Sequence, residues 1–303
     1  MSTFDVPHRE PSMISTAKNL PGQRQAAALT PMRRVLCGVL GAVVLAAAGG
    51  CTTTTHVTEA RTSPLNRSPS TMSELRIAEV ALDAGNTEMA KTVFERVVKT
   101  DPNSVPGLTG LGNTLYSVGD FTRAGVYFEQ ASRISPDDPT PLLGIARVAI
   151  RQHRFDDAIA ACRKVLQKTP DDALAMSALG VALDMKGEHA GAQAVLRQGL
   201  VSHPGDPLLS INLGLSLVLG GDPRQGANVL LDVTRYPSAP AQARQDLALA
   251  YGLMGNSQAA AAILSQDLPP ASVQDNLRFY EIQRARMAQR SSSASTVQTG
   301  AVQ

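Results

Sequence analysis

The chain has 303 residues, more than one small hydrophobic core requires and enough for one large domain or an array of repeats. Its 28 basic and 26 acidic residues leave a net charge of only +2, so no strong field attracts nucleic acid. There is no Trp, and aromatic residues make up 4% of the chain, too few for a platform that stacks bases. These features disfavour nucleic-acid binding.

The N-terminal region has the pattern of a secretory signal. Two arginines follow Met32, an apolar run of 14 residues extends from Val35 to Ala48, and two glycines precede Cys51. The run is shorter than the ~20 residues that a permanent membrane-spanning helix needs. We therefore expect a signal peptide over residues 32–50. The polar residues 1–31 should be absent from the mature protein, either because translation starts at Met32 or because they extend the signal.

The signal ends in a candidate lipid-attachment site. The run Leu-Ala-Ala-Ala-Gly-Gly before Cys51 resembles a bacterial lipobox, in which the cysteine is lipidated before cleavage. The alternative is an ordinary signal peptide beside an incidental cysteine. Thr52 after the cysteine resembles the pattern of lipoproteins sorted to the outer membrane. We expect Cys51 to hold the protein on that membrane, facing the periplasm, because each buried acyl methylene adds ~0.8 kcal/mol of membrane affinity.

A repeat organises the remainder of the chain. Prolines recur at Pro102, Pro136, Pro170, Pro204 and Pro237, separated by 34, 34, 34 and 33 residues. A 34-residue period resembles that of the tetratricopeptide repeat (TPR), a helix–turn–helix unit. The period predicts repeats over 71–104, 105–138, 139–172, 173–206, 207–240 and 241–271, with a capping helix over 272–289. A flexible tether over 51–70 precedes them, and a disordered tail over 290–303 follows.

Positions other than proline support the same register. The eighth and twentieth residues of every unit are small, which lets the two helices of a hairpin approach closely, and the twenty-fourth is larger. The small ones are Ala78, Gly112, Ala146, Gly180, Gly214, Ala248, Ala90, Ala124, Ala158, Ala192, Gly226 and Ala260. The larger ones are Phe94, Phe128, Cys162, Leu196, Leu230 and Leu264. Such hairpins stack to share one core, which predicts an all-α TPR α-solenoid, a right-handed superhelix of about six repeats.

Motifs of catalysis and metal binding are missing from the sequence. It has no glycine-rich phosphate loop, no His-Glu-x-x-His and no spaced Cys/His set. Acidic pairs such as Asp137-Asp138 and Asp171-Asp172 fall at helix ends, where helix capping explains them. We therefore expect a protein that is not an enzyme, with no metal, no cofactor and no small-molecule substrate.

The predicted binding surface is the groove that the first helices of the repeats form. Its apolar end is expected to contain Leu174, Val181, Met185, Leu208, Ile211, Leu215, Val218 and Leu219, and its polar, basic end Asn113, Arg147 and Arg151. An apolar strip of this kind suits an amphipathic helix or an extended apolar segment of a protein partner. The alternative is that these side chains pack against the following helices or the C-terminal cap.

The C-terminal stretch resembles one TPR lipoprotein family in particular. The runs that begin at Ala239 (Ala-Pro-Ala-Gln-Ala-Arg-Gln-Asp-Leu-Ala-Leu-Ala-Tyr-Gly-Leu) and at Val273 (Val-Gln-Asp-Asn-Leu-Arg-Phe-Tyr) are similar to those that close TadD proteins of the tight-adherence (Flp) pilus system. The resemblance implies a non-enzymatic outer-membrane protein that assists assembly or localisation of the secretin. A type IV pilotin and a scaffold for cell-wall hydrolases remain alternatives, as does an enzyme built on a solenoid, since fold alone does not determine function.

Overall fold

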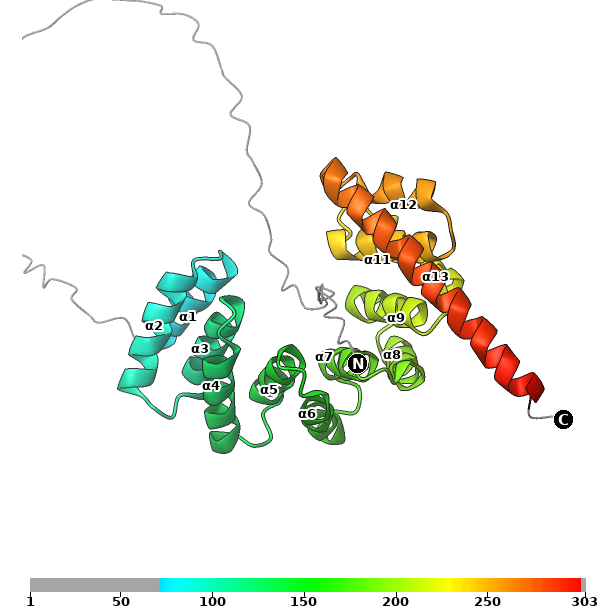
Figure 1. Cartoon of the computed structure of the whole chain (residues 1–303). Helices are drawn as coiled ribbons and strands as arrows, with labels where there is room; N and C mark the ends of the chain where they lie inside the picture. Colours follow the sequence, from blue (N-terminus) through cyan, green and yellow to red (C-terminus); the bar gives the residue numbers. More distant parts are fainter. Residues whose placement is uncertain (1–70, 301–303) are drawn as a thin grey trace, which may run out of the picture. The chain divides into compact units, whose positions relative to one another are not determined.

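The computed structural model describes residues 71–300, with side chains described as far as residue 289. Within this part of the chain every regular element is a helix, which confirms the all-α prediction (Figure 1). The helices are α1 (Thr71–Asp83), α2 (Thr87–Thr100), α3 (Val105–Ser117), α4 (Phe121–Ile134), α5 (Pro139–Arg151), α6 (Phe155–Lys168), α7 (Ala173–Met185), α8 (His189–Ser202), α9 (Pro207–Leu219), α10 (Pro223–Thr234), α11 (Ala241–Leu253), α12 (Ser257–Leu264) and α13 (Pro270–Gly300).

The odd-numbered helices from α1 to α11 begin at the residues where the 34-residue register places the start of each unit. Helix starts are determined locally, because an N-cap side chain must accept a hydrogen bond from an otherwise unpaired backbone N–H. Ser104, Asp138, Asp172 and Asp206 do this for α3, α5, α7 and α9. The acidic pairs noted in the sequence therefore contribute a helix cap at their second residue in two of these units.

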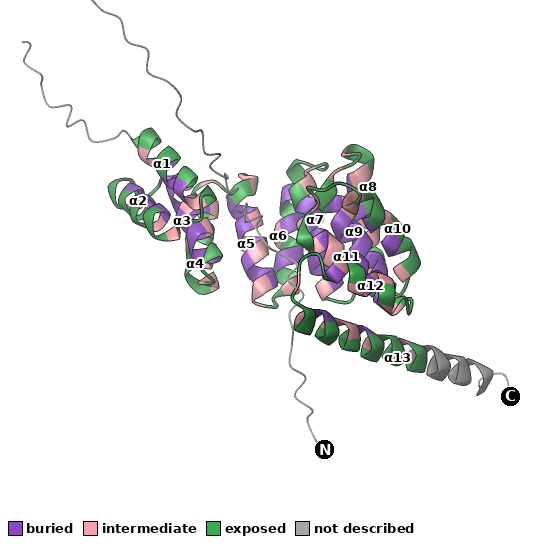
Figure 2. Cartoon of the chain, turned by 90° about the horizontal axis from the view of Figure 1, so that it is seen from above, coloured by how far each residue is buried: buried purple, intermediate pink, exposed green. Residues whose placement is uncertain are grey.

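The small and large positions of the register meet inside each hairpin. The six residues at position 24 are at most 1% exposed, and Phe128, Leu196 and Leu230 lie against glycines of the preceding helix. A Cβ atom on Gly214 would lie 2.5 Å from Leu230 Cγ, closer than carbon atoms can approach. The small residues thus set the close spacing of the two helices, and buried residues recur on the helices along the row (Figure 2).

Each helix packs on its neighbours in sequence, and the odd-numbered helices also contact one another across adjacent hairpins. Within the described residues, the even-numbered helices make no comparable contacts with one another. The closer approach on the odd side bends the row toward α1, α3, α5, α7, α9 and α11. We call the surface of these six helices the inner face.

α13 takes the place of a further first helix beside α11. Val273 and Tyr280 are 4% and 5% exposed and pack with Ala248, Ala260 and Leu264 of the last hairpin. The helix continues to Gly300, past residue 289 where the sequence pattern ends it. No Gly or Pro interrupts the chain between residues 271 and 299, so nothing in the tail stops a helix that is already formed.

Predictions that concern the N-terminus fall outside the described residues. These are the signal peptide, lipidation of Cys51 and the tether over 51–70. In the part of the chain that the structure does describe, no helix combines the length and the apolar character needed to cross a membrane.

Candidate partner-binding face

The apolar end of the predicted groove is only partly open. On α7 and α9, Leu174, Leu208 and Leu219 are 59%, 42% and 39% exposed, and Met185 is partly buried. Leu174 and Leu208 occupy the same position of neighbouring repeats, at the start of helices that contact each other. These side chains are therefore available to a partner on the inner face.

The middle of the predicted strip is closed. Val181, Ile211, Leu215 and Val218 are at most 8% exposed. Val181 packs within the core formed by α5, α6, α7 and α8, while Ile211 and Val218 pack with residues of α10 and α11. The structure places these four side chains in the packing role that was the alternative to binding, because the inner helices approach too closely to leave them in solvent.

The open leucines consequently form two edges instead of one strip. Leu208 and Leu219 lie eleven residues apart on α9, which corresponds to about 16 Å along a helix. Met185 lies at the position of α7 equivalent to Leu219, and Leu174 at the position equivalent to Leu208. A partner that contacts both edges must cross the inner face along the direction of α7 and α9.

The basic end of the groove is ordered by aromatic residues. The Arg147 guanidinium lies 4.2 Å from the ring centroid of Tyr116 and donates a hydrogen bond from Nη1 to Asn113 Oδ1 at 3.3 Å. Arg151 lies 5.0 Å from the ring centroid of Phe121. Burial raises the pKa of Tyr116, and the two arginines partly oppose this effect. The structure thus brings Asn113, Arg147 and Arg151 together on α3 and α5 around Tyr116 and Phe121.

A buried polar network joins α7 to α9, and the sequence analysis did not identify it. Ser216 Oγ donates to Asp184 Oδ1 at 2.8 Å, and His189 Nδ1 lies 2.9 Å from the same oxygen. Nearby, Asn212 Nδ2 donates to Ser177 Oγ at 2.7 Å. Burial raises the pKa of Asp184, while its hydrogen bonds from His189 and Ser216 lower it. The signal available in the sequence was an aspartate within the otherwise apolar run of α7.

Serine, histidine and aspartate in one network do not form a hydrolytic triad here. In a triad the serine hydroxyl bonds to the histidine, which removes its proton. Here Ser216 and His189 both bind the carboxylate of Asp184, and Ser216 is 0% exposed. The arrangement satisfies polar groups between two helices, which is the requirement for burying them. Among the described residues, no cluster of His, Cys, Asp or Glu is suited to holding a metal ion.

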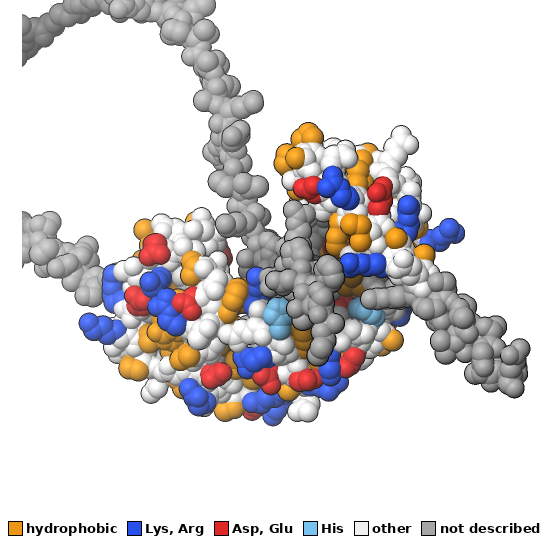
Figure 3. Space-filling model, viewed as in Figure 1, with side chains coloured by type: hydrophobic (Ala, Val, Ile, Leu, Met, Phe, Trp, Pro, Cys, Tyr) orange, Lys and Arg blue, Asp and Glu red, His pale blue; other side chains and the backbone are white. Residues whose placement is uncertain are grey.

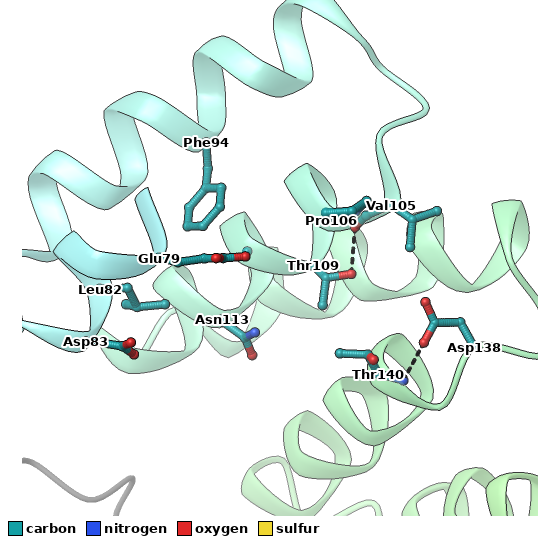
Figure 4. A pocket seen from close by; sticks show the side chains of 11 residues that line it. Glu79, Leu82, Asp83, Phe94, Val105, Pro106, Thr109, Asn113, Asp138 and Thr140 are labelled. Carbon is teal, nitrogen blue, oxygen red and sulfur yellow. Dashed lines mark hydrogen bonds between the residues drawn. The ribbon is translucent and has the colours of Figure 1, made fainter. Parts of the chain in front are cut away.

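A hollow of about 430 Å³ opens between the first three repeats on the inner face. Figure 4 shows Glu79 and Asp83 from α1 on one side, Asp138 and Thr140 at the start of α5 on the other, and residues of α3 between them. Its lining also includes Leu82, Phe94, Val105, Pro106, Thr109, Gly110 and Asn113. We call this hollow the acidic pocket, because its three charged lining residues are all carboxylates.

Elsewhere on the surface the charges are mixed. The face shown in Figure 3 has Lys and Arg side chains beside Asp and Glu side chains, as along α5 to α8. Lys186 illustrates the pattern, since its Nζ lies 2.8 Å from Asp156 and 2.9 Å from Glu188. The acidic pocket is distinguished from this surface by carrying only one sign of charge.

The amino-acid sequence of the chain is similar to a known repeat family. Two models described as tetratricopeptide repeat match the chain, one over residues 75–139 and the other over residues 115–179 and 149–213. Together the matched residues extend from α1 into α9. The solenoid is built of tetratricopeptide repeats. No curated protein sequence matches the chain at a significant level.

Solved TPR structures share this fold. A tetratricopeptide repeat protein from Parabacteroides merdae covers 73% of the chain and 88% of its own length at 12% identity and a TM-score of 0.61. PilW, a widely conserved type IV pilus biogenesis factor, aligns with 65% of this chain and over 91% of its own length, at 20% identity and a TM-score of 0.58. PilF of Pseudomonas aeruginosa aligns with 69% of this chain and over 96% of its own length, at 15% identity and a TM-score of 0.57. At these identities the likeness concerns the fold alone.

Proposed function

We propose that this TPR protein is a lipid-anchored scaffold that holds a protein partner during assembly of a Tad/Flp pilus and assists assembly or localisation of the secretin. The observation that carries the binding role is the set of open leucines on the inner face, Leu174, Leu208 and Leu219. TPR repeats bind other proteins, and Leu174 and Leu208 occupy equivalent positions on helices that contact each other, with both side chains left open by the core. The lipid on Cys51 would keep the scaffold at the outer membrane.

The form of the two leucine edges favours a helical partner segment. An amphipathic helix presents apolar side chains at i, i+4, i+7 and i+11, so its apolar stripe covers about 16 Å in three turns. This span equals the separation of Leu208 and Leu219 along α9. Such a helix, lying along α7 and α9, would place one anchor at each edge of the inner face.

The pilus role has separate support. The C-terminal runs from Ala239 and Val273 resemble TadD proteins, and PilW, a solved structure with this fold, is a type IV pilus biogenesis factor. A second candidate, a factor of type IV pili, is favoured by the shared fold of PilW, which is a type IV pilus biogenesis factor. The two candidates share the scaffold and differ in the partner that they hold.

The test is crosslinking in cells followed by identification of the captured protein. We expect the native chain to capture a secretin, and the double variant Leu208→Asp/Leu219→Asp to lose most of this capture while its circular dichroism stays native. The control is Val201→Asp/Leu231→Asp, because these residues are also exposed but lie on α8 and α10, outside the inner face. Leu215 is unsuitable as a probe, since an aspartate there would bury a charge.

Two results would contradict the proposal. Equal capture by the native chain and the Leu208→Asp/Leu219→Asp variant would remove the leucine edges from the binding surface. Consistent capture of proteins other than pilus-assembly components would reject the pilus role and leave the scaffold itself in place.

A further inference from the structure

The acidic pocket offers an interaction chemistry that the leucine edges do not. It lies on the first three repeats, at the other end of the inner face from α9. Its carboxylates come from separate elements: Glu79 and Asp83 are one turn apart on α1, and Asp138 immediately precedes α5. Helix α3 lies between them, so the fold brings together charges that are more than fifty residues apart in the sequence (Figure 4).

Apart from the carboxylates, the pocket is lined by apolar residues and by the neutral polar residues Thr109, Asn113 and Thr140. Leu82, Val105 and Pro106 contribute aliphatic surface, and the ring of Phe94 lies behind Gly110. A side chain at position 110 would collide with that ring, so glycine is required for α2 and α3 to pack as they do. The pocket therefore combines aliphatic walls with an anionic mouth.

One polar atom on each of Thr109, Asn113 and Asp138 around the pocket is already engaged. Thr109 Oγ1 donates to Val105 O at 2.7 Å, Asn113 Oδ1 accepts from Arg147, and Asp138 Oδ1 accepts from the backbone N–H of Thr140 at 2.8 Å. The carboxylates of Glu79 and Asp83 differ. Among the described residues neither has a hydrogen bond or an ion pair, and both are exposed. Two anions beside a hollow with an aliphatic wall are thus open to an external cation.

We propose that the acidic pocket binds the side chain of a lysine or arginine from a protein partner. Both side chains have an aliphatic stem that packs on apolar surface and a cationic head that stays near water and anions. The stem would lie against Leu82, Val105 and Pro106, and the head would reach Glu79 and Asp83. An acidic or purely apolar side chain lacks this complementarity, since the pocket has no basic lining residue.

This inference rests on the proposed function only in that the occupant belongs to a protein partner. The probes are N-acetyl-lysine methylamide and its norleucine analogue, which has a similar stem without the charge. Binding to the full chain in detergent is measured by NMR from the methyl signals of Leu82 and Val105. We expect the lysine probe to shift both signals and to bind about tenfold more tightly than the norleucine probe, because only the lysine probe forms ion pairs with the two carboxylates.

The variant Glu79→Gln/Asp83→Asn removes both charges with little change of shape, so lysine binding should weaken about tenfold. Glu88→Gln/Glu95→Gln on α2 makes the same charge change at exposed positions outside the pocket. The affinity of this variant for the lysine probe should stay within about twofold of that of the native chain. Equal binding of the two probes, equal weakening in both variants, or no methyl shift with lysine would each overturn the proposal. Capture at the leucine edges is measured separately, so either proposal can fail without the other.

Discussion

His153 occupies the turn position at which each of the other five hairpins has a glycine. The glycines at 85, 119, 187, 221 and 255 have φ between +75° and +95°, and His153 has φ +58°. A residue with a Cβ pays about 1 to 2 kcal/mol for this left-handed conformation. The packing of the two flanking helices holds the turn in this conformation despite its cost. The imidazole also packs edge-on against Phe155, with 5.6 Å between ring centroids.

Comparison of His153→Gly with His153→Ala isolates this backbone cost. Both variants lose the ring contact with Phe155, but only glycine relieves the strain at positive φ. We expect the glycine variant to be about 1 kcal/mol more stable than the alanine variant, after the larger unfolded-state entropy of glycine is counted. Urea unfolding followed by circular dichroism gives the difference. Equal stabilities would mean that the turn is unstrained.

At the scale of elements, the contact of α11 with α13 contains a carboxylate in an unfavourable place. Asp246 Oδ2 is buried and has no hydrogen-bond partner among the described residues. Burial raises the pKa of Asp246 to about 7, and burial together with the Asp246 charge raises the pKa of Tyr280 to about 12. By contrast, Arg244 of α11 forms a two-point ion pair, at 2.6 and 2.7 Å, with Asp267 in the segment that precedes α13.

The raised pKa of Asp246 predicts that stability falls as pH rises. Between pH ~4 and pH ~7 the unfolded carboxyl is ionised while the folded one keeps its proton. Each increase in pH over this range therefore lowers the free energy of the unfolded state relative to the folded state. The stabilising effect is complete below pH ~4 and lost above pH ~7. Asp246→Asn should remove this dependence and be of the order of 2 to 4 kcal/mol more stable than the native chain at pH 8, with little difference at pH 4.

Unfolding by urea at several pH values tests this expectation. Asp275→Asn serves as the control, since Asp275 is an exposed aspartate on α13 and its substitution should leave the pH dependence unchanged. If Asp246→Asn and the native chain lose stability in parallel between pH 4 and pH 7, other groups are responsible. Asp184 is the first of these to consider, because burial raises its pKa as well.

For the whole molecule, the question of attachment is independent of the fold. In the proposed function Cys51 carries the lipid, and several acyl chains would hold the protein firmly at ~0.8 kcal/mol for each buried methylene. We expect Cys51→Ser to move the protein from the membrane fraction to the soluble periplasmic fraction and to abolish labelling by radioactive palmitate. Thr52→Ser is the matched control and should leave both unchanged. Palmitate labelling of the Cys51→Ser variant would contradict lipidation at this residue.

Much of the solenoid is predictable because its information is local and repeated. Helix starts depend on caps such as Asp138 and Asp172, and hairpin spacing on small residues such as Gly214, all within a few turns of each other in sequence. Six nearly equivalent units reinforce one register, so single departures such as His153 do not obscure it. The groove was less predictable, since positions two and thirteen of α9 are open while positions five, nine and twelve are buried.

The period, the helix boundaries near the caps and the stacking of hairpins follow from the amino-acid sequence by itself, because each depends on contacts within one unit or between neighbours. Only the tertiary structure decides which inner-face side chains stay open, how Ser216 and His189 satisfy Asp184, and that Glu79, Asp83 and Asp138 share one pocket. These outcomes depend on how closely successive first helices approach. That distance is set by packing between units, which a periodic pattern does not specify.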